Sequence, residues 1–307
     1  KNDVVAMQLP NWWQFTALTL ACARIGAVAN PLMPIFRERE LGFMLRHGEA
    51  KVFVVPQRFR GFDHEAMAHG LARGLPTLRH VIVVDKAGPQ GFDALADAAP
   101  SERDRLRPTP DDIVQLIYTS GTTGEPKGVM HSSNTLMANI NAYAERLHLG
   151  AADRVLMASP MAHQTGFMYG LMMPIMLRAS VVLQDLWDPR RAIELIQSER
   201  VTFTMASTPF LADLTKGVAE SHQDVPTLKT FLCAGAPIPG PLVSEARRVL
   251  GTKIISAWGM TENGAVTLTK PEDDDALSAT TDGDALPGVE VKVVDDDDRA
   301  LAAGTIG

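Results

Sequence analysis

Short apolar segments alternate with helical patterns along most of the chain, and this alternation predicts β-strands joined by helices. In the first part we expect strands at residues 3–9, near Val28, at 52–55 and at 80–84, with helices at 15–24, 38–46 and 92–98. In the second part we expect strands at 113–118, near Val155, at 181–183, 203–205, 231–232 and 254–255, with a helix at 133–148. Such alternation is typical of an α/β fold with mostly parallel sheets covered by helices.

Beyond Pro271 the pattern changes to acidic runs and a final alternating segment, 289–294, which predicts one more strand. We therefore expect a first α/β subdomain at 1–110, a second at 111–270 and the start of a small β portion at 271–307. The acidic runs near Asp273 and at 295–298 lack the glycine and distal glutamate of an EF-hand, so we interpret them as solvated turns.

Composition and net charge limit the classes of protein to which this chain can belong. Of the 307 residues, 46 % are hydrophobic and 21 % charged, so the chain can bury a core and is not expected to be disordered. The 29 Lys and Arg against 36 Asp and Glu give a net charge of −7, which disfavours nucleic acid as a partner. Cys22 and Cys233 lie far apart, outside any CxxC spacing, and are predicted to be lone buried thiols suited to a reducing compartment.

The chain lacks the features of secreted and membrane-spanning proteins. No apolar run reaches the roughly 18 residues of a membrane helix, and no secretory signal precedes the first strand. We therefore expect a cytoplasmic protein without a transmembrane segment. Its oligomeric state is left open, with a dimer as one option. Because the chain opens on Lys1, already next to a strand, we expect it to be a trimmed piece of a longer protein.

One loop carries the strongest chemical signal. Residues 118–129 read YTSGTTGEPKGV, between an apolar strand and a helix. Glycines let the backbone N–H groups converge, hydroxyl side chains add donors and Lys127 adds a cation, a combination that suits a polyphosphate. It is not a Walker A loop, because Pro126 and Gly128 stand where that motif requires Gly and Ser or Thr.

This loop resembles, without a gap, the signature loop of the adenylate-forming superfamily, which includes acyl- and aryl-CoA ligases, nonribosomal adenylation domains and luciferase-like enzymes. Three further segments resemble the family's motifs in the family's order: 159–166 (SPMAHQTG), 234–239 (AGAPIP) and 257–262 (AWGMTE). The resemblance implies the large N-terminal domain of such an enzyme, with stacked sheets flanked by helices. It also implies that the ribose-binding Asp, the hinge and the small domain with the catalytic lysine would follow beyond Gly307.

The resemblance implies a role for each matching residue. The ATP phosphates would be bound by Thr119, Ser120, Gly121, Thr122, Thr123, Gly124 and Lys127. The adenine would lie against Gly235, Ala236, Pro237, Ala257, Trp258 and Gly259. The acyl pocket would be lined by His163, Gly166, Phe167, Met168, Met172 and Ala234. Thr261, Glu262 and Lys127 would act in catalysis, with Glu262 holding Mg²⁺.

The implied activity converts a carboxylic acid to an acyl-adenylate with ATP and Mg²⁺, then to a thioester with coenzyme A. Methionines near His163 make the expected acyl pocket apolar, which favours a hydrophobic monocarboxylic acid. Residues 160–170 look most like those of cyclohexanecarboxylate and fatty acid ligases. The alternatives are an adenylation domain that loads a carrier protein and a non-catalytic nucleotide-binding remnant, with a P-loop ATPase more distant. We expect weak nucleotide binding and poor turnover from the chain alone.

Overall fold

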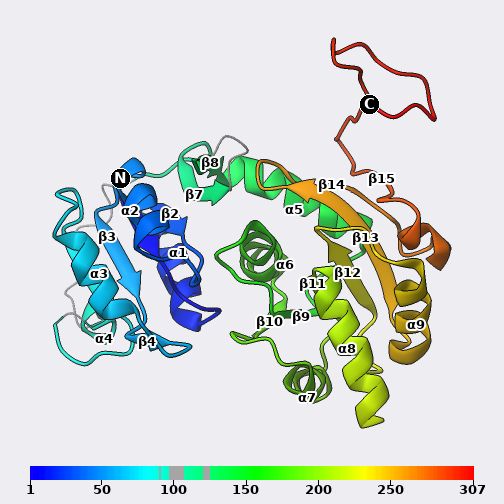
Figure 1. Ribbon diagram of the computed structural model, residues 1–307, viewed down its shortest axis with the longest axis horizontal. Coiled ribbons are helices and arrows are strands. Elements are labelled where there is room, and N and C mark those ends of the chain that lie inside the picture. The colour runs from blue at the N-terminus through cyan, green and yellow to red at the C-terminus, as the bar shows by residue number, and fades with distance from the viewer. Residues whose placement is uncertain (90, 97–106, 120–124) are drawn as a thin grey trace.

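The computed structural model describes residues 1–89, 91–96, 107–119 and 125–307. Two sheets stand on either side of a shared helical layer (Figure 1). The first sheet has the order β6 (His80–Val83), β3 (Val52–Val55), β1 (Val4–Met7), β2 (Val28–Pro31), β7 (Ile113–Thr119), β8 (Lys127–Ser132). Its strands are parallel except at the β7–β8 edge, which is antiparallel.

The second sheet is also mainly parallel. Its order is β10 (Ser180–Leu183), β9 (Arg154–Met157), β11 (Phe203–Ala206), β12 (Thr230–Ala234), β13 (Lys253–Met260), β14 (Gly264–Leu268), β15 (Asp284–Ala285). The strands run parallel from β10 to β13, and then β14 and β15 add an antiparallel edge. A short hairpin, β4 (Arg58–Phe59) and β5 (Phe62–Asp63), stands apart from both sheets.

Helices cover both faces of each sheet (Figure 1). Outside the first sheet lie α2 (Glu38–His47) and α3 (His64–Ala72). The short α4 (Asp93–Ala96) follows β6 along the chain. Between the sheets lie α1 (Trp13–Ile25), α5 (Ser133–Arg146), a π-helix at Gly166–Met172 and α6 (Met173–Leu177). Outside the second sheet lie α7 (Pro189–Glu199), α8 (Thr208–Ser221) and α9 (Gly240–Leu250). The α/β architecture with parallel-rich sheets is therefore confirmed.

Side chains that alternate between the two faces of each strand explain why helices can pack on both faces of a sheet. On β3, Phe53 and Val55 belong to the outer core with α2 and α3, whereas Val54 belongs to the central core. On β12, Phe231 belongs to the core with α7 to α9 and Leu232 to the central core. Successive residues of a strand point to opposite faces, so an uninterrupted apolar run fits a strand buried on both sides.

Two expectations about chain organisation need correction. The loop that begins after Thr119 does not lead straight into a helix, because Lys127–Ser132 returns antiparallel along β7 before α5 begins. Both strands of this hairpin belong to the first sheet, so the boundary between the sheets falls after Ser132 and not at residue 110. The backbone of β8 pairs with that of β7 and so satisfies hydrogen-bonding groups along β7. The apolar pattern alone did not reveal this pairing.

The strand predicted at 289–294 is wrong. In this segment the structure has only an isolated bridge between Val294 and Ala300. Val291 and Val293 are 51 % and 48 % exposed, so the apolar alternation has no sheet face to pack against. This end of the chain extends away from the body of the molecule (Figure 1), and alternation without a partner strand does not form a sheet.

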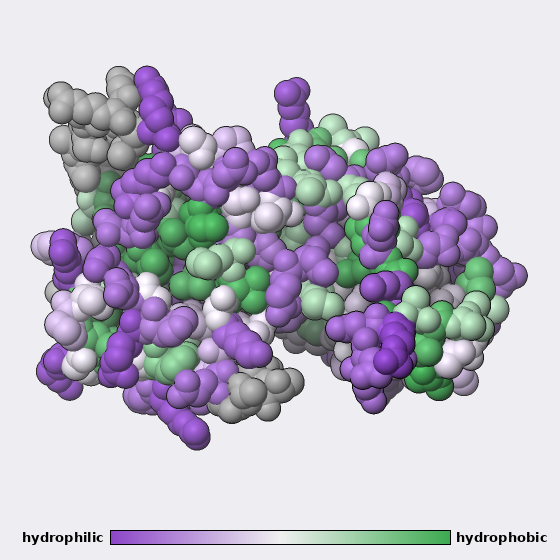
Figure 2. Space-filling view, turned by 90° about the horizontal axis from the view of Figure 1, so that it is seen from above, coloured by the Kyte–Doolittle hydropathy of each residue, from purple (hydrophilic) through white to green (hydrophobic). Residues whose placement is uncertain are grey.

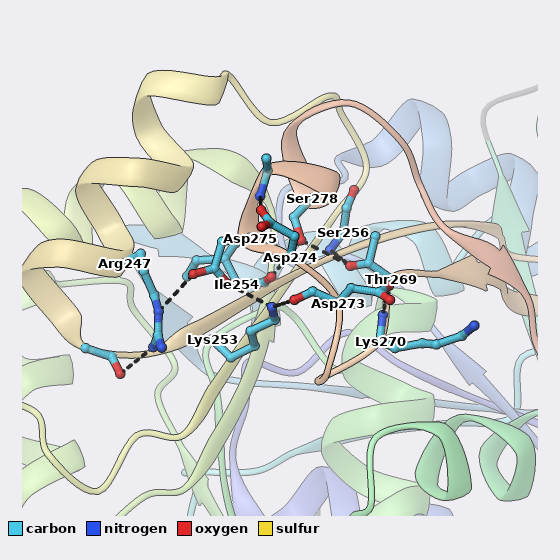
Figure 3. A network of polar contacts seen from close by, with 12 residues as sticks. Arg247, Lys253, Ile254, Ser256, Thr269, Lys270, Asp273, Asp274, Asp275 and Ser278 are labelled. Atoms are coloured by element: carbon cyan, nitrogen blue, oxygen red, sulfur yellow. Dashed lines mark hydrogen bonds and ion pairs between the residues drawn. The ribbon is translucent and has the colours of Figure 1, made fainter.

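The first acidic run does more than form a solvated turn (Figure 3). The Asp275 carboxylate pairs with Lys253 Nζ at 2.8 Å and with Arg247 Nε at 3.0 Å. The Asp274 side chain accepts a hydrogen bond from Ala276 N and caps a 3₁₀ helix at Asp275–Ala279. Ser278 Oγ donates to the main-chain oxygen of Ile254 on β13 over 2.7 Å. This network ties the segment to the strand that ends at the site described below.

Cys22 and Cys233 are free and buried, as predicted, and burial raises the pKa of both thiols. Within the described ranges, no helix is both long and apolar enough to cross a membrane. Hydrophilic residues cover most of the face shown in Figure 2, and hydrophobic residues appear there in separate small patches.

Candidate functional site

A cavity of about 600 Å³ opens at the carboxyl ends of β9, β11, β12 and β13, with Thr119 at the end of β7 on its wall. Parallel α/β sheets bind ligands at this end of their strands, because the connecting loops converge there. A second hollow of about 520 Å³ lies between α7 and α8 on the outer face, and none of the predicted site residues lines it. The cavity at the strand ends is therefore the candidate site.

Nine of the residues expected from sequence line this cavity together: Thr119, His163, Ala234, Gly235, Ala257, Trp258, Gly259, Thr261 and Glu262. They come from both sheets and from three loops that are distant in sequence. The residues Ser120, Gly121, Thr122, Thr123 and Gly124 lie outside the described residues. Lys127 does not line the cavity, but it stands opposite Thr119 in the β7–β8 register and is exposed.

Four of the residues expected in the acyl pocket do not line the cavity: Gly166, Phe167, Met168 and Met172. The π-helix turns Phe167 and Met168 into the central core, where they are 1 % and 0 % exposed. Gly166 packs on the main chain of Pro160, so closely that a Cβ would lie 2.2 Å from its oxygen. Of the expected adenine contacts, Ala236 and Pro237 are exposed beyond Gly235 and also lie outside the lining.

Other lining residues were given no individual role from the sequence, although Gln164 and Tyr169 fall within the segment 160–170 that resembles the family. They include Met33, Gln164, Tyr169, Met205, Ser207, Phe210 and Ala265. Met205 lies near the carboxyl end of β11 and Ser207 directly follows that strand, so the tendency of ligands to bind at strand ends could have pointed to them. Tyr169 lies in the segment 160–170, but the sequence did not show which side chains of this segment face the cavity, because the segment forms a π-helix and not an α-helix.

Two neighbouring strand ends form one wall of the cavity. Ala234 and Ala257 are direct partners in the parallel β12–β13 register. Just beyond Ala257, the pairing of β13 with β14 shifts between Trp258 and Gly259. A bulge of this kind changes the direction of a side chain next to it. The Trp258 side chain, 45 % exposed, lies on the cavity wall, where it offers a flat aromatic surface to a ligand.

Thr261 and Glu262 lie on the turn between β13 and β14, and a histidine holds this turn from behind. His131 Nε2 donates to the main-chain oxygen of Thr261 over 2.8 Å, and His131 Nδ1 lies 3.1 Å from Thr135 Oγ1. His131 is 2 % exposed. It connects the β7–β8 hairpin to the turn that ends with Asn263. The local sequence gives no sign of this contact, because the partner of His131 is 130 residues away.

The loop that carries His163 is anchored by Asn11, from the connection between β1 and α1. Asn11 Oδ1 accepts a hydrogen bond from Met161 N at 2.7 Å, and its amide donates to Ser159 O at 2.9 Å. His163 stands exposed at the cavity, yet the protein around its ring lowers its pKa by desolvation. Thr165 N donates to His163 Nδ1 over 3.3 Å, so Nε2 carries the proton of the neutral ring.

The donor set fits a divalent cation that arrives with a phosphate ligand. Glu262 supplies an exposed carboxylate at the cavity, and the hydroxyl-bearing residues Thr119 and Thr261 line the same cavity. Among the described residues no group of three or more His, Cys, Asp or Glu could hold a metal on its own. Mg²⁺ commonly takes one or two protein carboxylates and completes its shell with water and substrate phosphates. This site matches that pattern.

Comparisons with known proteins agree with the fold. A family model described as "AMP-binding enzyme" matches residues 1–307. The chain is 35 % identical to the medium-chain fatty-acid–CoA ligase of Escherichia coli over 310 residues, which cover 100 % of this chain and 55 % of that protein. It is 30 % identical to the salicylyl-CoA synthase / salicylate adenylyltransferase of a Streptomyces species, covering 100 % of this chain and 57 % of that protein.

A solved structure has a similar fold. The ATP-bound MatB of Rhodopseudomonas palustris superposes with a TM-score of 0.85 at 25 % identity, covering 99 % of this chain and 58 % of that one. The chain thus spans a little over half the length of the relatives that it matches.

Proposed function

Since the chain belongs to the family of AMP-binding enzymes, we propose that it is the nucleotide- and acid-binding part of an acyl-CoA synthetase. The whole enzyme would use ATP to convert a carboxylic acid to an acyl-adenylate and then to a CoA thioester, releasing pyrophosphate and AMP. The observation that carries this proposal is the meeting of Thr119, Trp258, Glu262 and His163 around one cavity.

The residues suit the first step of that reaction. A free carboxylic acid is ionised near neutral pH, so its attack on the α-phosphorus needs no general base. It needs the two reactants held in line and the growing charge on pyrophosphate stabilised. The aromatic face of Trp258 is suited to the adenine, and the Thr119 and Thr261 hydroxyls to phosphate oxygens. The neutral His163 offers an Nε2–H toward the acid. Mg²⁺, bound through Glu262, would supply charge stabilisation to the phosphates.

The lining supports a hydrophobic monocarboxylic acid. Met33, Met205 and Phe210 give the cavity apolar walls, and Glu262 is its only Asp, Glu, Lys or Arg among the described lining residues. A second carboxylate on the substrate would therefore find no cationic side chain there. We propose a medium-sized aliphatic or alicyclic acid, with fatty and cyclohexanecarboxylic acids as the first candidates and coenzyme A as the thiol acceptor.

A carrier-protein-loading adenylation domain is the alternative enzyme, and it would use the same first step. A second alternative is a nucleotide-binding module without catalysis. Pyrophosphate exchange by the whole enzyme, with octanoate, cyclohexanecarboxylate and benzoate offered in turn, separates catalysis from binding alone. Transfer from the adenylate to coenzyme A or to a phosphopantetheine protein then separates the two enzymes.

The binding part of the proposal can be tested on this chain directly. We expect calorimetry to detect ATP binding in the presence of Mg²⁺, and Glu262→Gln to weaken it because the carboxylate ligand is lost. Glu272→Gln is the matched control, since it removes the same charge from an exposed position outside the cavity. Equal affinity of both variants and the unchanged chain would argue against Glu262 as the metal ligand.

A further inference from the structure

The hydroxyl of Tyr169 and the amide of Asn139 together hold one residue of β14. Tyr169 Oη donates to Asn139 Oδ1 over 2.7 Å and accepts a hydrogen bond from Ala265 N at 2.8 Å. Asn139 Nδ2 donates to Ala265 O at 2.6 Å. Both backbone polar groups of Ala265 are therefore engaged by side chains from two helices. All three residues are buried, with exposures of 2 %, 8 % and 5 %.

The surroundings leave this cluster little freedom. The Tyr169 ring stacks on Tyr143 with a centroid distance of 4.1 Å and an interplanar angle of 25°. Gly264, next to Ala265, has a φ of +71°, and a Cβ there would lie only 2.6 Å from Asn139 Oδ1. Asn139 can approach the hairpin this closely because residue 264 is a glycine.

The cluster lies directly behind the turn that carries Thr261 and Glu262. β13 ends at Met260 and β14 begins at Gly264, so only three residues separate the two strands. His131 holds the turn at the oxygen of Thr261, and the Tyr169–Asn139 pair holds it at Ala265. The Glu262 side chain thus projects from a backbone that is fixed on both sides.

We propose that Tyr169 is a positioning residue for Glu262 and acts through its hydrogen bonds to Asn139 and Ala265. The inference rests on the proposed function, in which Glu262 binds the Mg²⁺ that accompanies ATP. The Tyr169 ring also lines the cavity, and Tyr169→Phe keeps that ring. The hydroxyl can therefore be removed while the shape of the cavity is preserved.

Tyr143 provides a matched control. It is stacked on Tyr169 and equally buried, but its hydroxyl contacts Met205 Sδ at 3.1 Å instead of the hairpin. Tyr143→Phe and Tyr169→Phe each remove one buried hydroxyl from the same aromatic pair. Only the second change removes the partner of the Ala265 backbone N–H.

The experiment measures the Kd of ATP by calorimetry on this chain with 5 mM MgCl₂ and with EDTA, and records the thermal midpoint of each variant. Mg²⁺ should tighten ATP binding by the unchanged chain and by Tyr143→Phe to the same extent. In Tyr169→Phe this Mg²⁺ enhancement should fall roughly five- to tenfold, as expected for two lost hydrogen bonds, with the Kd in EDTA nearly unchanged. Asn139→Ala, which changes the partner of Tyr169 on α5, should give the same loss of the Mg²⁺ enhancement.

The outcomes separate this inference from the proposed function. If the unchanged chain binds no ATP, the proposed function itself fails. If the unchanged chain shows the Mg²⁺ enhancement and Tyr169→Phe retains it in full, the positioning role is overturned. A loss that is equal with Mg²⁺ and with EDTA, or one shared by Tyr143→Phe, would show a general structural effect and would also overturn it.

Discussion

His131 Nε2 donates to the main-chain oxygen of Thr261 over 2.8 Å, which joins the hairpin of the first sheet to the turn of the second. A strand next to the predicted phosphate loop is thereby connected to the turn that carries Glu262. Because the histidine is buried, its contact is shielded from water, and the two parts of the candidate site are positioned relative to each other.

Replacing His131 with alanine should therefore affect both stability and ligand binding. We expect the free energy of unfolding to fall by about 1–3 kcal/mol, because the oxygen of Thr261 loses its donor. The Kd of Mg·ATP should rise as the turn loosens. Urea unfolding and calorimetry measure the two effects. His148→Ala is the control, since His148 is exposed and lies outside the cavity lining. The prediction is wrong if both variants behave alike.

Trp258 should contribute to nucleotide affinity through its aromatic face. Trp258→Ala should weaken ATP binding about three- to tenfold, the range expected for one aromatic contact, whereas Trp258→Phe should retain part of it. Calorimetry gives both values. Trp13→Ala serves as the control, because Trp13 is 62 % exposed and packs against Phe92, outside the cavity lining. An unchanged Kd of ATP in Trp258→Ala would show that the adenine does not lie against Trp258.

Gly264 and Gly61 allow backbone strain to be separated from steric conflict. Both have positive φ, +71° and +78°, but a Cβ would collide with Asn139 only at Gly264 and would meet nothing within 4 Å at Gly61. We expect Gly264→Ala to destabilise the chain by about 1–3 kcal/mol more than Gly61→Ala, because buried groups must move to make room. Thermal or urea unfolding measures the difference. Equal losses of stability in the two variants would show that backbone strain at positive φ, and not the conflict with Asn139, causes both.

Ala234 should limit the space available to the acid. A leucine at this position would project from the cavity wall beside Ala257, so larger acids should lose affinity more than small ones. Ala236→Leu is the control, since Ala236 is exposed outside the lining. Pyrophosphate exchange by the whole enzyme with acids of increasing size measures the preference. An unchanged preference in Ala234→Leu would exclude Ala234 from the acyl pocket.

His64 should make stability depend on pH. Burial, with a further contribution from Arg37, lowers the pKa of His64 to about 4, and its Nδ1 lies 3.1 Å from Gln8 Oε1. The unfolded chain binds a proton near pH 6.5 and the folded chain does not, so stability falls as the pH decreases from about 6.5 toward 4. Between pH 7 and 5 we expect a loss of about 2 kcal/mol.

Urea unfolding at the two pH values tests this prediction. His64→Gln should flatten the dependence in that window, because glutamine does not titrate. His80→Gln is the control, since His80 is exposed at the start of β6 and shows no comparable burial. A slope that persists in His64→Gln would assign the effect to other groups.

Local patterns in the sequence predicted most of the elements correctly. The strand at 52–55 and the helix at 133–148 were recognisable because apolar periodicity reflects burial directly. The pattern failed at 289–294, where alternation did not meet a partner strand. Whether a strand finds a partner depends on residues elsewhere in the chain, and a short local window does not contain them.

The sequence alone determined the α/β class and most of its strands and helices, because these depend on neighbouring residues. The tertiary structure alone decided that Phe167 and Met168 pack into the core while Tyr169 reaches the cavity, and that His131 and Asn139 hold the turn of Glu262. These contacts join residues that are separated by 30 to 130 positions, and such proximity arises only when the two sheets pack on their shared helical layer.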